Sequence, residues 1–80
     1  SMEPEIHDGQ IVFVRSRSEL ESGRVGIFIF RGEAYCKRLQ RDAHGAYLVS
    51  INARYKPIAL PAGEPVRVCG EVVGLGPMAD

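Results

Sequence analysis

The sequence contains few of the residues on which metal and redox sites are built. Its 80 residues include two cysteines, two histidines and two lysines. Cys36 and Cys69 form no Cys-x-x-Cys pair, and no histidine lies at metal-ligand spacing from either. We therefore expect two buried free thiols, as in a protein of the reducing cytosol, and neither a metal nor another cofactor.

Net charge and long apolar runs are also lacking. Ten basic and ten acidic residues cancel, which argues against a broad electrostatic surface for nucleic acid. The longest apolar run, Val25–Phe30, is far shorter than a membrane span, and no signal peptide is visible. We therefore expect a cytoplasmic chain without a membrane partner, and if the parent protein binds DNA, another part of it must do so.

Helical periodicity is absent as well, because apolar residues never keep helical spacing for a dozen positions. The pattern instead predicts about six strands separated by turns that contain glycine or proline. The predicted strands are residues 10–15, 24–30, 33–40, 46–51, 58–60 and 65–75. We predict an all-β fold, a small and strongly bent β-sheet or partly open barrel that forms a single domain over residues 1–80.

The turns make this prediction more specific. Arg31-Gly32 suits a tight hairpin, whereas residues 41–45 predict a longer hairpin loop that ends in a glycine with positive φ. The nearly unbroken apolar run over 24–30 predicts burial on both faces. Residues 58–60 lie between two prolines and are expected at a sheet edge, and the glycines of the last strand predict bulges.

One lysine lies inside an apolar strand. Alternation along 33–40 places Lys37 on the same face as Tyr35 and Leu39, with Cys36 on the other face. Burial disfavours the ammonium form, and a neutral amine can activate a serine hydroxyl, which is a poor nucleophile without a base. Lys37 is therefore a candidate general base. Composition alone leaves two ordinary alternatives open, a solvated surface lysine and an N-terminal serine left by tag removal.

Several short motifs follow one another along nearly the whole chain. They are Ser1-Met2-Glu3-Pro4, Asp8-Gly9 before an apolar strand, Gly23-Arg24-Val25, Tyr35-Cys36-Lys37-Arg38-Leu39, Asn52-Ala53-Arg54-Tyr55-Lys56-Pro57-Ile58 and Gly70-Glu71-Val72-Val73-Gly74. In this order they resemble the C-terminal domain of LexA-type repressors, phage repressors and UmuD-like proteins, the self-cleaving serine peptidases related to signal peptidase. Each motif alone is weak, but the ordered series is specific.

The resemblance implies a Ser–Lys dyad in which Ser1 is the nucleophile and Lys37 the general base. It also implies that backbone N–H groups at Ser1, and in residues that would precede it, form the oxyanion hole. No histidine, metal or cofactor takes part. We therefore expect His7 and His44 to be loop residues, and Lys56 to be a solvated loop charge.

The resemblance further implies the peptidase and dimerisation domain of a bacterial repressor of the SOS-response type, truncated at its N-terminus. A homodimer is expected through the C-terminal strand, residues 66–74. The DNA-binding part and the segment that is cleaved would both lie upstream of residue 1. Two alternatives stay open: a non-catalytic self-association module of a transcriptional regulator, and a fragment of a signal peptidase.

Overall fold

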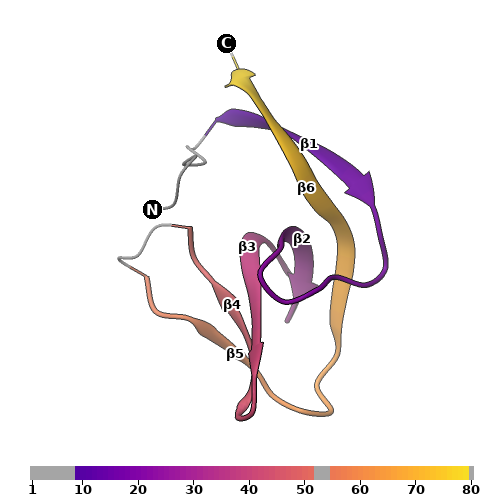
Figure 1. The fold of residues 1–80 in the computed structure, drawn as a ribbon, viewed down its shortest axis with the longest axis vertical. Helices are drawn as coiled ribbons and strands as arrows, with labels where there is room; N and C mark the ends of the chain where they lie inside the picture. Colours follow the sequence, from indigo (N-terminus) through magenta and orange to yellow (C-terminus); the bar gives the residue numbers. More distant parts are fainter. Residues whose placement is uncertain (1–8, 52–54, 80) are drawn as a thin grey trace.

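The chain forms one antiparallel sheet of six strands in the computed structural model, which describes residues 9–51 and 55–79. The strands are β1 (Gln10–Ser16), β2 (Val25–Phe30), β3 (Glu33–Asp42), β4 (Gly45–Val49), β5 (Ile58–Leu60) and β6 (Val66–Met78). Their order across the sheet is β1-β6-β2-β3-β4-β5, with β5 at an edge as predicted (Figure 1). The all-β prediction is confirmed, and the sheet stays open rather than closing into a barrel.

The turn between β2 and β3 sets the register of the central hairpin. Arg31 and Gly32 have φ values of 51° and 79°, and the flanking residues Phe30 and Glu33 pair directly. Two residues in the left-handed region match the right-handed twist of the strands, so the predicted tight hairpin is confirmed. The Arg31 guanidinium also donates to both carboxylate oxygens of Glu64, at 2.5 and 2.8 Å, which links this turn to the β5–β6 loop.

The turn between β3 and β4 is shorter than predicted. Strand pairing continues as far as Asp42 and Gly45, so only two residues remain in the turn in place of a five-residue loop. Asp42 Oδ1 accepts hydrogen bonds from the backbone N–H groups of His44 at 2.8 Å and Gly45 at 3.1 Å. A short polar side chain that binds its own turn in this way stabilises a tight connection. Gly45 has the positive φ that was expected, 145°.

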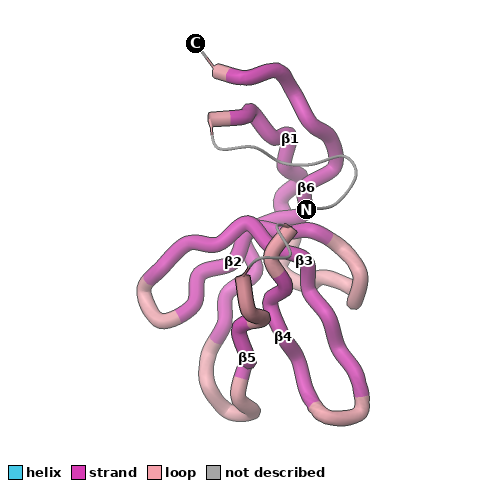
Figure 2. Tube along the Cα trace, turned by 90° about the vertical axis from the view of Figure 1, so that its left-hand side faces the viewer, coloured by secondary structure: helices cyan, strands magenta, loops and turns pink. Residues whose placement is uncertain are grey.

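The long strand β6 joins the two halves of the sheet. Its first half pairs with β2 and its second half with β1, and the register shifts in both pairings as it passes Gly70 and Gly74. A Cβ at Gly70 would lie 2.8 Å from the backbone oxygen of Arg15, so glycine allows the strands to approach closely there. Beyond Gly70, β1 and the second half of β6 form a two-stranded ribbon, here called the β1–β6 ribbon. It projects away from the hairpins formed by β2 to β5 (Figures 1 and 2).

The hydrophobic core lies on one face of the sheet. Phe28, Leu39 and Leu48 are at most 2% exposed, and Leu20, from the segment between β1 and β2, packs against them. Burial alternates along β2, and the residues between the buried ones are half-buried. The prediction that the run 24–30 is buried on both faces is therefore wrong, because only one face of β2 is fully covered. No helix in the described part of the chain is long and apolar enough to cross a membrane.

Candidate active site

Lys37 lies in the middle of β3, opposite Gly26 of β2. As alternation predicts, its side chain shares a face with Tyr35 and with Leu39, and Leu39 is a member of the hydrophobic core. Lys37 is half-buried. The structure therefore places this lysine at the margin of the core and not on a fully solvated strand.

Leu20 fills the space that Gly26 leaves open beside Lys37. A Cβ at residue 26 would lie 2.6 Å from Leu20 Cδ2 and 2.8 Å from the backbone oxygen of Gly70. Gly26 pairs directly with Lys37, so Leu20 lies over the β2 position that is opposite the lysine.

Hydrogen bonds fix the segment that carries Leu20 along β3. The Gly23 N–H donates to the Leu39 carbonyl at 2.7 Å, and the Leu39 N–H donates to the Arg24 carbonyl at 2.9 Å. The Arg38 guanidinium also donates to the Gly23 carbonyl. These bonds keep Leu20 over Gly26, an arrangement that the sequence motifs did not reveal.

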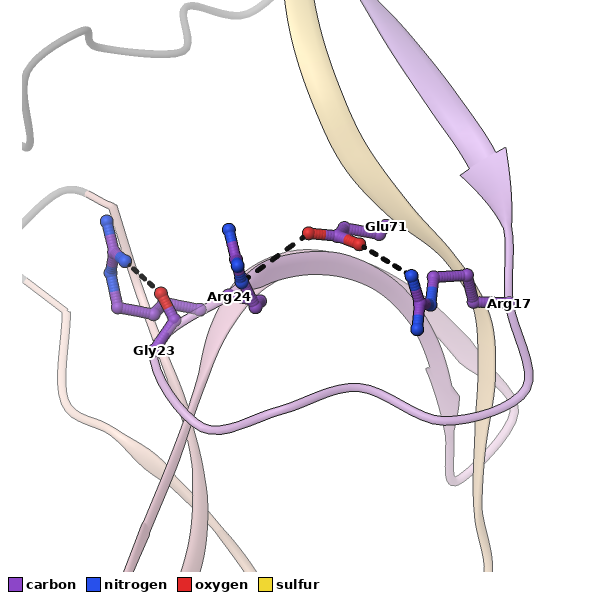
Figure 3. A network of polar contacts seen from close by, with 5 residues as sticks. Arg17, Gly23, Arg24 and Glu71 are labelled. Atoms are coloured by element: carbon purple, nitrogen blue, oxygen red, sulfur yellow. Dashed lines mark hydrogen bonds and ion pairs between the residues drawn. The ribbon is translucent and has the colours of Figure 1, made fainter.

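Glu71 brings an acidic group to the same part of the sheet. It pairs in register with Gly26, one strand beyond Lys37. Its carboxylate, with a side chain 14% exposed, lies 3.5 Å from Arg17 Nη1 and 3.7 Å from Arg24 Nε (Figure 3). The two guanidinium groups balance its charge, and none of the ion pairs among residues 9–51 and 55–79 includes Lys37.

An aromatic ring lies beside the Lys37 amine. The distance from Nζ to the Tyr35 ring centroid is 5.8 Å, which is within the range of a cation–π contact. The Tyr35 hydroxyl donates to Glu33 Oε2 at 3.0 Å. This hydrogen bond, with a smaller contribution from burial, raises the pKa of the Tyr35 phenol. The ring therefore stays uncharged at pH values where an ordinary tyrosine begins to ionise.

The two thiols are free, and they are half-buried rather than fully buried as expected. Cys36 follows Tyr35 on β3 and projects to the face opposite Lys37. Burial raises the pKa of the Cys36 thiol, although the neighbouring Lys37 charge opposes the change. Cys36 is accordingly a protonated thiol near neutral pH, and the geometry gives it no part in the site.

Part of the predicted site lies outside the described residues. Ser1, its backbone N–H and His7 all fall within residues 1–8. His44 lies in the β3–β4 turn and Lys56 in the loop before β5, and both are exposed as expected. The part of the chain that the structure describes holds no group of three or more His, Cys, Asp or Glu residues suited to a metal ion.

The whole span from Ser1 through Lys37 matches one family of proteins. A family model described as Peptidase S24-like covers residues 1–73. The chain belongs to the Peptidase S24-like family. This membership confirms the resemblance carried by the ordered motifs, and it agrees with the open antiparallel sheet.

This S24-like chain is also similar to LexA repressors of several bacteria. It is 38% identical to that of Oleidesulfovibrio alaskensis over 69 residues, which are 86% of this chain and 33% of the repressor. Identity to the Magnetococcus marinus protein is 34% over 74 residues, 92% of this chain and 32% of the relative. Identity to the Corynebacterium jeikeium repressor is 37% over 70 residues, which are 88% of this chain and 25% of that repressor. The chain thus spans a third or less of the length of these curated relatives.

Proposed function

We propose that residues 1–80 are the C-terminal Ser–Lys peptidase and dimerisation domain of a longer cytoplasmic repressor, which binds DNA through another part. Membership of the S24-like family and similarity to LexA repressors support this function and favour it over a signal peptidase fragment. The observation that carries the peptidase is the placement of Lys37. It is half-buried between Tyr35 and the core, and no ion pair among the described residues includes it.

In the proposed reaction Lys37 is the general base for Ser1. Its neutral Nζ takes the proton of the Ser1 hydroxyl while the oxygen attacks a peptide carbonyl carbon. Backbone N–H groups, that of Ser1 among them, stabilise the tetrahedral oxyanion. The protonated amine returns its proton to the leaving nitrogen as the C–N bond breaks. Water then hydrolyses the ester, which releases the new carboxyl group and restores the Ser1 hydroxyl.

Self-cleavage that accelerates with pH is the result expected of a longer protein that includes the sequence preceding residue 1. Because the lysine must be neutral to accept the proton, the rate should rise about tenfold per pH unit below the lysine range. Incubation from about pH 7 to about pH 10, followed by intact-mass analysis, gives both the rate and the cleaved bond. A folded protein that stays intact across this range contradicts the proposed peptidase.

Apolar side chains on the β1–β6 ribbon support the proposed self-association. Ile11, Phe13 and Val14 on β1, with Val73 and Met78 on β6, are 42% to 55% exposed. Beyond Gly70, where β6 pairs with β1, the ribbon projects away from the hairpins formed by β2 to β5 (Figure 2). A second copy of the chain that covers these side chains would remove their apolar surface from water.

Val73→Asp is expected to move self-association to higher concentration, because a carboxylate would have to be desolvated in the proposed interface. Tyr55→Asp is the matched control, since Tyr55 is 65% exposed and lies outside the ribbon. Sedimentation equilibrium over a concentration series measures both variants. A wild-type chain that stays monomeric at every concentration, or equal effects of the two changes, contradicts the proposed interface. Dimerisation without cleavage in the longer protein favours the non-catalytic module.

A further inference from the structure

We propose that the Tyr35 ring holds Lys37 in its charged form and so sets the pH at which the site becomes active. This inference rests on the proposed role of Lys37 as the base. The amine lies 5.8 Å from the ring centroid. An aromatic face attracts an ammonium group, whereas a neutral amine gains little from it. The contact therefore opposes the proton loss that the reaction needs, and Tyr35 is a positioning residue that acts through Lys37.

The ring is held at both ends. Its body packs against the hydrophobic core cluster, and it lies directly opposite the buried Phe28 in the β2–β3 pairing. Its hydroxyl donates to Glu33 Oε2 at 3.0 Å. The packing against the core and Phe28 fixes the position of the ring beside Lys37, and the hydrogen bond engages the Glu33 carboxylate.

The charged groups on the strands around Lys37 are engaged elsewhere or lie on the other face, so the Tyr35 ring is the contact that favours the ammonium form. β2 has no ionisable side chain. On β6, Glu71 is shared by two arginines of the β1–β2 segment, as Figure 3 shows. Tyr47 of β4 pairs with Gln40 and so lies on the opposite face. The acidic residues that flank the inward-pointing Leu20 are exposed. On this face of β3, Arg41 donates to the Leu20 carbonyl at 3.3 Å, and Glu33, the remaining carboxylate, is bound to the Tyr35 hydroxyl.

Competitive acylation of the two lysines tests the ring contact without any need for peptidase activity. Only the neutral amine reacts with a trace of acetic anhydride, and the exposed Lys56 is an internal standard in the same molecule. Tyr35→Leu keeps an apolar side chain and removes the ring. Near neutral to mildly alkaline pH it should raise the ratio of Lys37 to Lys56 labelling about two- to fivefold, the effect expected for a cation–π contact near the surface.

Tyr35→Phe is the matched control, because it keeps the ring face and removes only the hydroxyl; its labelling ratio should equal that of the wild type. Fluorinated phenylalanines at position 35 then weaken the attraction of the ring with little change in shape, so the ratio should rise with the number of fluorines. The fluorinated phenylalanines still test the proposal if the Tyr35→Leu protein fails to fold. The proposal is overturned if the ratio of Lys37 to Lys56 labelling does not change with the number of fluorines. It is also overturned if this ratio rises equally in Tyr35→Phe and Tyr35→Leu.

The cleavage of the longer protein provides the second readout. Tyr35→Leu should move the rising limb of the rate–pH profile to lower pH by about 0.4–0.7 units, while Tyr35→Phe leaves it in place. If the Tyr35→Leu protein cleaves measurably and the rising limb of its rate–pH profile stays at the wild-type pH, the proposal is overturned. If the labelling ratios change as expected and no variant cleaves, the ring contact is upheld and the proposed peptidase function is the part that fails.

Discussion

Replacing Lys37 by alanine is expected to slow self-cleavage of the longer protein by about 100- to 10,000-fold, the usual contribution of a general base. The serine hydroxyl is a weak nucleophile until a base accepts its proton. On this face of β3 the neighbours of Lys37 offer no substitute: Leu39 is apolar, the residue opposite is Gly26, and the hydroxyl of Tyr35 donates to a carboxylate. The variant should therefore lose the pH-dependent reaction.

The chain provides its own control for this experiment. Lys56 is the other lysine of the sequence, and it lies exposed before β5. Lys56→Ala should cleave at the wild-type rate with the wild-type pH profile, and circular dichroism should show both variants folded. Equal loss of cleavage in the two variants, or wild-type cleavage by Lys37→Ala, contradicts the role assigned to Lys37.

Replacing Phe28 by alanine is expected to lower the free energy of unfolding by about 3–5 kcal/mol. Phe28 is 1% exposed and packs with Leu20, Leu39 and Leu48, so the change removes a buried ring and leaves a cavity among its neighbours. Small domains are stable by only about 5–15 kcal/mol, so much of the stability should disappear. Phe28 is also the cross-strand partner of Tyr35, and its loss should loosen the ring beside the lysine.

Phe13→Ala is the matched control, because Phe13 lies on the β1–β6 ribbon and is 55% exposed. The same chemical change at an exposed position should alter the free energy of unfolding by about 0.5 kcal/mol. Urea unfolding at a concentration where the chain is monomeric compares the two variants through their midpoints. Equal destabilisation by both changes contradicts the placement of the core on the Phe28 face.

The strands could be predicted because their signals are local. Arg31-Gly32 is a turn that two residues specify, so the tight hairpin between β2 and β3 could be predicted. Period-two alternation was enough to place Lys37 on the face of Tyr35. The β3–β4 loop was predicted too long because its closure depends on two hydrogen bonds to the Asp42 side chain, which the glycine position alone does not reveal.

The surroundings of Lys37 could not be predicted, because they depend on contacts between distant segments. Leu20 is the only apolar residue in 16–23, which indicates that this segment packs against the core through Leu20. The sequence does not indicate which part of the core Leu20 contacts. Its position over Gly26 depends on how closely β2 approaches β6. The pairing of Glu71 with two arginines requires β6 to lie between β1 and β2, an order that no local pattern encodes.

The self-cleavage rate of the longer protein carrying Ser1→Ala tests the central claim most directly, namely that the Ser1 hydroxyl attacks while Lys37 takes its proton. Ser18→Ala, which changes an exposed serine between β1 and β2, is the control. We expect the Ser1→Ala protein to stay intact at every pH at which the wild-type and Ser18→Ala proteins cleave. Cleavage of Ser1→Ala at the wild-type rate and at the same bond contradicts it.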